Sequence, residues 1–253
     1  MGVAVETRGL TRAFGGFVAV DHLDLRVDEG EVFGFLGLNG AGKSTTIKML
    51  ATLLAPSAGT ARVAGHDVVA DPVAVRAAIG LVADEGAEAC GSWSPREYLG
   101  YFARLRGLPR PGERVERALD EVALRPEWRG RALSLHSTGM RRRVDVARAL
   151  LASPRVLFLD EPARGLDLPA KLETWDLLRR LAADEGVTVF LSSHEAPEIQ
   201  ALCRRVAVLA SGRLTYDGPA ASLGRDAEAL ASSLVRLLDP DGEASKRSKP
   251  AVR

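Results

Sequence analysis

The sequence predicts an α/β fold with a mostly parallel β-sheet, an N-terminal antiparallel β part and an inserted α-helical segment. Short apolar, β-branched runs alternate with helical patterns along the chain, which is typical of strands joined by covering helices. The run at 156–159 is apolar throughout and the run at 187–191 is apolar except for Thr188, as expected of strands that are covered on both faces. The stretch from about 88 to 143 carries helical patterns alone and therefore interrupts the alternation as an insertion.

In the first ninety residues, strands and helices are predicted from apolar runs and from helix-start residues. Strands are expected at 17–20, 22–27, 31–36, 61–64 and 79–82. Helices are expected at 45–53, directly after a glycine-rich segment, and at 72–77, where a proline occupies the first turn.

The inserted segment has a strong helix-start pattern. Residues 94–97, Ser-Pro-Arg-Glu, form a capping box with a proline at the first helical position. From there a helical pattern continues to about residue 124, with Leu99, Phe102 and Leu105 spaced for one buried face. After the insertion, strands are expected at 156–159, 187–191 and 206–209, and an amphipathic helix is expected at 226–238.

Composition and charge exclude several classes of protein. The 253 residues suffice for one large domain or two small ones, and 46% apolar with 26% charged residues is ordinary globular usage. The 34 basic and 33 acidic residues nearly cancel, which argues against nucleic acid as a partner. Two cysteines, Cys90 and Cys203, fit a reducing compartment. We expect no membrane span and no signal peptide, because apolar runs are short and residues 1–10 carry charges of both signs.

A glycine-rich motif lies between a predicted strand and a predicted helix. Its pattern is Gly37-x4-Gly42-Lys43-Ser44, in which the glycines let successive backbone N–H groups point at phosphate oxygens. Lys43 can reach the β and γ phosphates, and the Ser44 hydroxyl is a ligand for Mg2+. The residues expected to bind nucleotide here are Gly37, Asn39, Gly40, Ala41, Gly42, Lys43, Ser44 and Thr45. The motif predicts a nucleoside-triphosphate site and makes the expected fold a P-loop NTPase core.

Two carboxylates follow the apolar strand at 156–159. Asp160 is expected to bind Mg2+, directly or through water, and Glu161 is placed to polarise an attacking water as general base. Solvated acids at a strand end are the alternative, and the phosphate loop elsewhere in the chain argues against it.

Several motifs together resemble the ATP-binding subunit of an ABC transporter, from about residue 5 to 223. In the order and spacing of that family they are Phe14, 37–45, 136–140, 156–161, 165–167 and 191–194. The sequences of segments 140–151 and 159–167 are most similar to those of the ATPase subunits of ABC-2-type exporters, the drug-resistance and polysaccharide or lipid efflux type. The resemblance implies an ATPase domain at 1–223, with a helical subdomain at about 88–143, and a C-terminal helix and polar tail at 224–253.

The resemblance also implies roles for single residues. Phe14 stands where the family stacks an aromatic ring on adenine, and a core position is the alternative. Ser137 and Gly139 fall in the signature segment, a helix start that binds the γ-phosphate held by the opposite subunit. His194 matches the switch histidine that senses the γ-phosphate, with a structural histidine as the alternative. Asp167 matches the loop that joins the two nucleotide sites across a dimer.

The chain departs from the family pattern at three places. The signature usually reads Leu-Ser-Gly-Gly-Gln, and the residues that differ here are His136, Thr138 and Met140. Leu38 replaces a usual proline, which changes the stiffness of the phosphate loop. Residues 83–86, Ala-Asp-Glu-Gly, stand where the family has a glutamine that contacts Mg2+ and the membrane partner. Asp84 then either adds a negative charge near the metal or lies in a solvated loop turned toward that partner.

Three surface features each allow two interpretations. The arginines at 141–143 either bind nucleic acid or form a solvated face beside the signature segment. Trp93 and Tyr98 form either part of a docking groove for a membrane partner or ordinary core packing. The polar residues 239–253 form either a solvated tail or a weak contact with anionic lipid through Lys246, Arg247, Lys249 and Arg253.

These features predict a subunit that hydrolyses ATP and powers transport, with export as the expected direction, through a separate membrane permease. Two copies, or this chain and a related one, would sandwich two MgATP molecules, and ATP-driven closure of the dimer would do the work. The expected location is cytoplasmic, on the inner face of the membrane. A soluble ABC-type ATPase acting on ribosomes or DNA is the alternative, and a non-hydrolysing regulator is a third that Glu161 argues against.

Overall fold

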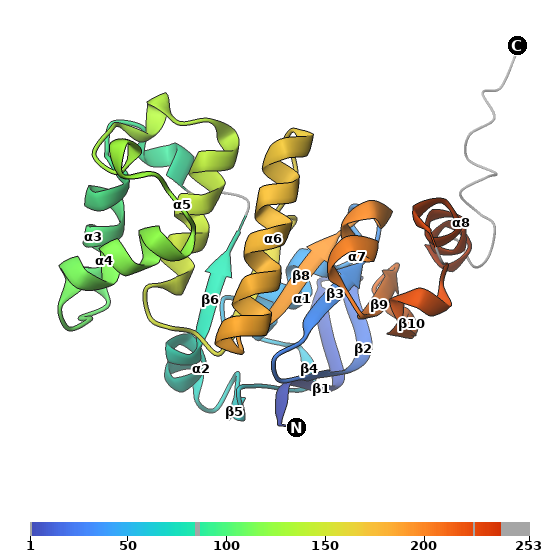
Figure 1. The fold of residues 1–253 in the computed structure, drawn as a ribbon. Helices are drawn as coiled ribbons and strands as arrows, with labels where there is room; N and C mark the ends of the chain where they lie inside the picture. The colour runs from blue at the N-terminus through green and yellow to red at the C-terminus, as the bar shows by residue number, and fades with distance from the viewer. Residues whose placement is uncertain (1, 84–86, 225, 239–253) are drawn as a thin grey trace, which may run out of the picture.

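The computed structural model describes residues 2–83, 87–224 and 226–238, which form two β-sheets with helices packed around them (Figure 1). Two sequence-based hypotheses lie outside these residues, namely the role of Asp84 and the nature of the tail at 239–253. Among the described helices, none is both long enough and apolar enough to cross a membrane.

The larger sheet is mostly parallel, as the sequence predicts. Its strand order is β10-β9-β3-β8-β7-β6, and only the pair β9 and β10 is antiparallel among the described strands of this sheet. The strands are β3 (Val32–Leu36), β6 (Ile79–Val82), β7 (Val156–Asp160), β8 (Thr188–Ser193), β9 (Arg205–Ala210) and β10 (Arg213–Pro219). The carboxyl ends of the parallel strands meet at one edge of the sheet, which is where such folds place their ligands.

The smaller sheet is antiparallel and has the strand order β2-β1-β4-β5. Its strands are β1 (Val3–Phe14), β2 (Phe17–Asp28), β4 (Ala58–Val63) and β5 (His66–Asp67). The hydrophobic pattern misses β1, because bulges shift its register against β2 and hide the alternation of apolar and polar residues. The two short strands expected at 17–20 and 22–27 are one continuous strand, β2, in which His22 has a positive φ of 49°.

Helices lead into and out of the core strands. Outside the insertion they are α1 (Lys43–Leu50), α2 (Pro72–Ala78), α6 (Leu168–Glu185), α7 (Ala196–Leu202), the short η4 (Ala220–Ser222) and α8 (Ala227–Leu238). The predicted helix at 226–238 is confirmed as α8, and Leu230 and Leu234 bury one of its faces against the core.

The segment between β6 and β7 is helical. It contains η1 (Ala87–Cys90), α3 (Pro95–Leu105), α4 (Pro111–Glu121), η2 (Pro126–Trp128), η3 (Leu133–Leu135) and α5 (Thr138–Leu150). In Figure 1, α3, α4 and α5 gather at one end of the molecule, away from β10 and α8 at the other end. The chain returns from this segment to the sheet through α5, which contacts β6.

The capping box at the start of α3 is confirmed, but the helix ends sooner than its pattern predicts. The Ser94 hydroxyl accepts a hydrogen bond from the Glu97 backbone N–H, and the Glu97 carboxylate accepts one from the Ser94 N–H. Gly107 has a positive φ of 62°, and α3 ends before it. Leu105 is therefore on the exposed last turn, 66% accessible, and its predicted place on the buried face of Leu99 is wrong.

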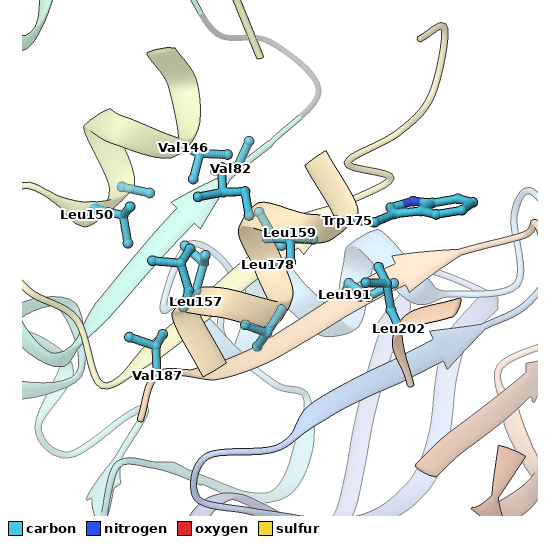
Figure 2. Close-up of a cluster of buried hydrophobic side chains, with 14 of the residues drawn as sticks. Val82, Val146, Leu150, Leu157, Leu159, Trp175, Leu178, Val187, Leu191 and Leu202 are labelled. Carbon is cyan, nitrogen blue, oxygen red and sulfur yellow. The ribbon is translucent and has the colours of Figure 1, made fainter. Parts of the chain in front are cut away.

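Two hydrophobic cores lie on opposite faces of the larger sheet, because successive side chains of a strand point to opposite sides. On one face, Leu157 and Leu159 of β7 pack with residues of α5 and α6, as Figure 2 shows. On the other face, Phe158 of β7 packs with Phe190 of β8 among residues of α1 and the smaller sheet. The sheet is thus covered on both sides, which explains the apolar run of β7.

Candidate functional site

The phosphate loop follows β3 and leads into α1, in the setting that the motif requires. Gly40 and Gly42 have positive φ values of 80° and 108°, where L-residues with side chains are strained. A Cβ on Gly42 would lie 2.4 Å from the Ala19 carbonyl oxygen, and one on Gly37 would lie 2.6 Å from the Leu209 carbonyl oxygen. Glycine is therefore required at 37 and 42 by close packing of the loop against neighbouring strands.

Lys43 is held inside this loop. Its side chain is only 5% exposed, and Nζ donates hydrogen bonds to the carbonyl oxygens of Gly37 at 2.7 Å and Leu38 at 3.3 Å. Burial lowers the pKa of the Lys43 ammonium, while Glu161 and Asp160 act in the opposite direction. The loop thus presents one cation, partly compensated by the carboxylates that follow β7.

A cavity of about 350 Å3 opens beside the loop. Its lining residues are Phe14, Phe17, Ala19, Leu38, Asn39, Gly40, Gly42, Lys43, Ser44, Thr45, Asp160, Glu161 and Arg164. The structure thereby brings together most residues that the sequence predicts for a nucleotide and its metal ion. Gly37 and Ala41 belong to the same loop, whereas His194 reaches the site through a contact with Glu161.

Asp160 and Glu161 are joined through one serine. The Ser192 hydroxyl on β8 donates a hydrogen bond to Asp160 Oδ1 at 2.5 Å and accepts one from the Glu161 backbone N–H at 3.0 Å. Asp160 and Ser192 are also register partners across β7 and β8. No local motif predicts this role of Ser192, because only the pairing of β7 with β8 places it beside Asp160.

Glu161 adopts an unusual backbone conformation. Its φ is +48°, in the left-handed region that residues other than glycine seldom adopt and that is frequent at functional sites. Oε1 lies 3.6 Å from Lys43 Nζ and 3.2 Å from His194 Nδ1. Oε2 is buried and has no hydrogen-bond partner among the described residues, with Arg164 Nε at 3.8 Å. The carboxylate is oriented toward the phosphate loop through Oε1.

A buried carboxylate supports the turn that carries His194. Glu198 is 2% exposed and accepts hydrogen bonds from the Ser193 hydroxyl at 2.6 Å and from Trp175 Nε1 at 3.2 Å. The Ser193 hydroxyl in turn accepts a hydrogen bond from the Glu195 backbone N–H at 3.0 Å. Burial raises the pKa of Glu198, and its two side-chain hydrogen bonds oppose the shift.

Phe14 is not a core residue. It is 46% exposed at the end of β1, pairs across the hairpin with Phe17 and lines the cavity. The Arg12 guanidinium lies 4.5 Å from its ring centroid, which is a cation–π distance. The exposed ring is therefore in a position to contact a flat ligand in the cavity.

Ser137 and Gly139 are at the start of α5, outside the residues that line the cavity. Ser137 is the N-cap, and its hydroxyl accepts a hydrogen bond from the Met140 N–H at 3.2 Å. Gly139 is buried, and a Cβ there would lie 2.8 Å from the Ala170 Cβ of α6. The structure therefore does not bring these two residues to the phosphate loop of the same chain.

The structure decides two interpretations that the sequence left open: the solvated face is wrong, and core packing is confirmed for Tyr98 alone. The arginines at 141–143 do not form a solvated face, because all three are partly buried and Arg142 donates hydrogen bonds to four backbone carbonyls. Tyr98 is core, with its hydroxyl 3.4 Å from Asp145 Oδ1, whereas Trp93 remains 37% exposed and packs edge-on against Tyr101. Helical patterns do not reveal where long side chains reach.

The donor set fits a magnesium ion. Mg2+ prefers hard oxygen ligands and keeps several waters, binding proteins through one or two side chains and substrate phosphates. Ser44 supplies an exposed hydroxyl at the start of α1, and Asp160 supplies a carboxylate that faces the same cavity. No cluster of three or more His, Cys, Asp or Glu side chains suited to a metal occurs among the described residues. Ser44 and Asp160 are therefore suited to a metal ion that is also bound by the phosphates of a nucleotide.

Comparison with known proteins shows the family. The family model described as ABC transporter matches residues 20–164. A daunorubicin/doxorubicin resistance ATP-binding protein from Streptomyces peucetius is 43% identical over 236 residues, which are 92% of this chain and 70% of that protein. A bacitracin transport ATP-binding protein from Bacillus licheniformis is 34% identical over 219 residues, 87% of this chain and 71% of that protein.

Solved structures share the fold. The cbiO1 protein of Clostridium perfringens, part of the ABC transporter complex cbiONQ, has a TM-score of 0.80 and 25% identity over 98% of both chains. A dimeric ATP-binding cassette in a post-hydrolysis state bound to ADP and Pi has a TM-score of 0.74 and 22% identity, over 85% of this chain and 98% of that one. The chain therefore belongs to the ABC transporter family, as an ATP-binding subunit with ATPase activity.

Proposed function

We propose that the cavity binds ATP with its phosphates in the loop 37–45 and its adenine against Phe14. The observation that best supports this proposal is the distance of 3.6 Å between Glu161 Oε1 and Lys43 Nζ, which puts a candidate base beside a candidate phosphate ligand. The loop contributes the backbone N–H groups and helix start that favour anions. The exposed ring of Phe14 offers a stacking surface in the same cavity.

Ser44 and Asp160 would hold Mg2+ at this site. When bound, the ion would neutralise part of the phosphate charge and orient the terminal phosphate. Ser192 orients Asp160 through a 2.5 Å hydrogen bond, so the carboxylate is preorganised rather than free to rotate. This arrangement supports Ser44 and Asp160 as the metal-binding pair.

Glu161 is the proposed general base. Its carboxylate would accept a proton from a water molecule as that water attacks the γ-phosphate, which gives ADP and phosphate. Oε1 is the oxygen that faces Lys43 and the phosphate loop, and it is therefore the one placed to accept that proton. His194 lies 3.2 Å from Oε1 and would hold the carboxylate in orientation while sensing the phosphate.

Two subunits would complete the site. Ser137 and Gly139 cap a helix start outside the cavity of their own chain, so we propose that they bind the γ-phosphate held by a second copy or a related chain. Asp167, the N-cap of α6, would join the two sites across that interface. On this proposal residues 1–223 are the ATPase domain, with the helical subdomain at about 88–143, and 224–253 are a C-terminal helix and polar tail.

The work of ATP hydrolysis would be passed to an integral membrane permease, at the cytoplasmic face of the membrane. The relatives named above are a drug-resistance protein and a bacitracin transport protein, and they support export as the direction. They give no support to the alternative of a ribosome- or DNA-directed ATPase.

The test is purification of the tagged full chain from membranes of its own cell, followed by identification of its partner. We expect a multi-span membrane protein at fixed stoichiometry and MgATP hydrolysis by the complex. Recovery with ribosomes or nucleic acid instead of a membrane protein would contradict the transport assignment. A complex that binds MgATP but never turns it over would contradict Glu161 as the base.

A further inference from the structure

The Arg142 guanidinium is the centre of a dense set of backbone contacts next to the site. Nε donates to the Pro162 carbonyl oxygen at 3.0 Å, and Nη1 donates to that of Ala83 at 3.2 Å. Nη2 donates to the carbonyl oxygens of both Asp160 and Glu161 at 3.0 Å. One side chain of α5 thus connects the end of β7 with the residue that follows β6.

The contact with Glu161 matters because this residue is strained. A positive φ at a residue other than glycine persists only where the surrounding structure holds it. The Ser192 hydroxyl holds the Glu161 N–H, and Arg142 holds the Glu161 carbonyl oxygen. Both peptide groups of the residue are therefore fixed, one from β8 and the other from α5.

Only arginine can make this set of contacts. A guanidinium presents five N–H donors in a rigid planar fork, whereas a lysine ammonium is a single point with three rotatable donors. The carbonyls that Arg142 contacts come from two segments, and its three nitrogens share them. A lysine at this position would keep the charge but would lose most of the connections.

We propose that Arg142 is a positioning residue for hydrolysis, which holds the backbone of Glu161 so that its carboxylate reaches the attacking water. The inference rests on the role proposed above for Glu161. Its contacts with the described residues at the end of β7 are with the backbone carbonyls of Asp160, Glu161 and Pro162, and it acts on the base through them. Its loss would let Glu161 relax out of the left-handed conformation and move its carboxylate away from the phosphate loop.

The test compares MgATP turnover and MgATP affinity in the full chain and its variants. For Arg142→Lys and Arg142→Gln we expect kcat to fall by roughly 10–100-fold, since a misplacement of about 1 Å can cost 10²-fold. The Kd for MgATP should stay within about twofold, because the phosphate ligands are untouched. In Arg142→Ala, added guanidinium ion at millimolar, non-denaturing concentration should restore part of the lost turnover.

Arg148→Gln is the matched control. Arg148 is on the same helix and donates to one backbone carbonyl, that of Leu81, away from Glu161. This variant should keep the wild-type kcat, and thermal unfolding should show comparable stability for it and for Arg142→Lys.

Three results would overturn the inference. These are wild-type turnover in Arg142→Lys and Arg142→Gln, an equal loss in Arg148→Gln, or a loss of MgATP affinity that parallels the loss of kcat. Glu161→Gln is measured alongside, so that failure of the premise is recognised separately. Normal turnover in Glu161→Gln would remove Glu161 as the base, whereas normal turnover in the Arg142 variants alone would remove only the positioning role.

Discussion

The carboxylate Oε1 of Glu161 lies 3.6 Å from Nζ of Lys43, so the proposed base and the proposed phosphate ligand form one ion pair at the carboxyl edge of the sheet. Both side chains are well shielded, at 11% and 5% exposure, which strengthens the pair relative to a surface salt bridge. A phosphate that binds Lys43 would share this cation with Glu161. The pair therefore links nucleotide binding to the orientation of the base.

Replacement of Glu161 separates binding from hydrolysis. Glu161→Gln keeps the shape of the side chain but cannot accept a proton, so we expect turnover to slow by roughly 10²–10⁴-fold with MgATP binding retained. The variant should also accumulate as an ATP-bound dimer, measured by size-exclusion chromatography with MgATP. Glu195→Gln, which removes a carboxylate paired with Lys171, is the control and should turn over ATP. Normal turnover in Glu161→Gln would move the base role to another group, with His194 the first candidate.

Lys43→Ala should strongly weaken MgATP binding without unfolding the chain. Loss of a charge-assisted phosphate contact costs roughly 2–4 kcal/mol, which is at least about 30-fold in Kd. Lys48→Ala is the matched control, because Lys48 is on the same helix with an exposed side chain. Titration calorimetry gives both affinities, and circular dichroism checks the fold. Equal affinity in wild type and Lys43→Ala would exclude the loop as the phosphate site.

Phe14→Ala should weaken ATP more than it weakens tripolyphosphate. The ring can stack on the base and touches no phosphate, and base–aromatic stacking contributes roughly 1–3 kcal/mol. Val18→Ala, at another exposed position of the same hairpin, is the control and should change neither affinity. If Phe14→Ala weakened both ligands to the same extent, the ring would act on the loop and not on adenine.

Glu198 predicts a pH dependence of stability. Its pKa is raised by burial above the ordinary value of 4.5, so the folded chain holds this proton more tightly than the unfolded chain. The stabilisation is complete below the unfolded pKa and is lost as the pH rises through the folded pKa. Glu198→Gln keeps the shape of the protonated side chain and does not titrate. The free energy of unfolding of Glu198→Gln minus that of wild type should therefore be larger at pH 8 than at pH 5, measured by urea denaturation. If this difference in free energy of unfolding were the same at both pH values, the raised pKa would be contradicted. Glu228→Gln, at an exposed position, serves as the control.

The local motifs of the site could be predicted because each depends on a short stretch of backbone. The loop around Lys43 is specified by glycines at close-packed and positive-φ positions and by a helix that begins directly after them. The capping box at Ser94 is specified by residues three apart in one turn. Such signals require no knowledge of what packs against the segment.

Predictions that depended on distant partners were incomplete. Strand β1 was missed because its bulges are stabilised by pairing with both β2 and β4, and this pairing is invisible in a periodic pattern. Leu105 shares the helical spacing of Leu99, yet α3 ends at that turn and nothing covers it among the described residues. Periodicity identifies a face, whereas packing decides which part of the face is buried.

The sequence by itself determined the α/β class, the phosphate loop and the two carboxylates after β7, because hydrophobic pattern and motif spacing are local properties of the chain. Tertiary structure alone decided how Glu161 is held. Its left-handed backbone depends on a hydroxyl from Ser192, 31 residues away, and a guanidinium from Arg142, 19 residues away. The physical reason is that a strained residue is stable only when groups from other elements fix both of its peptide bonds. Those groups meet only once the sheet and α5 have packed.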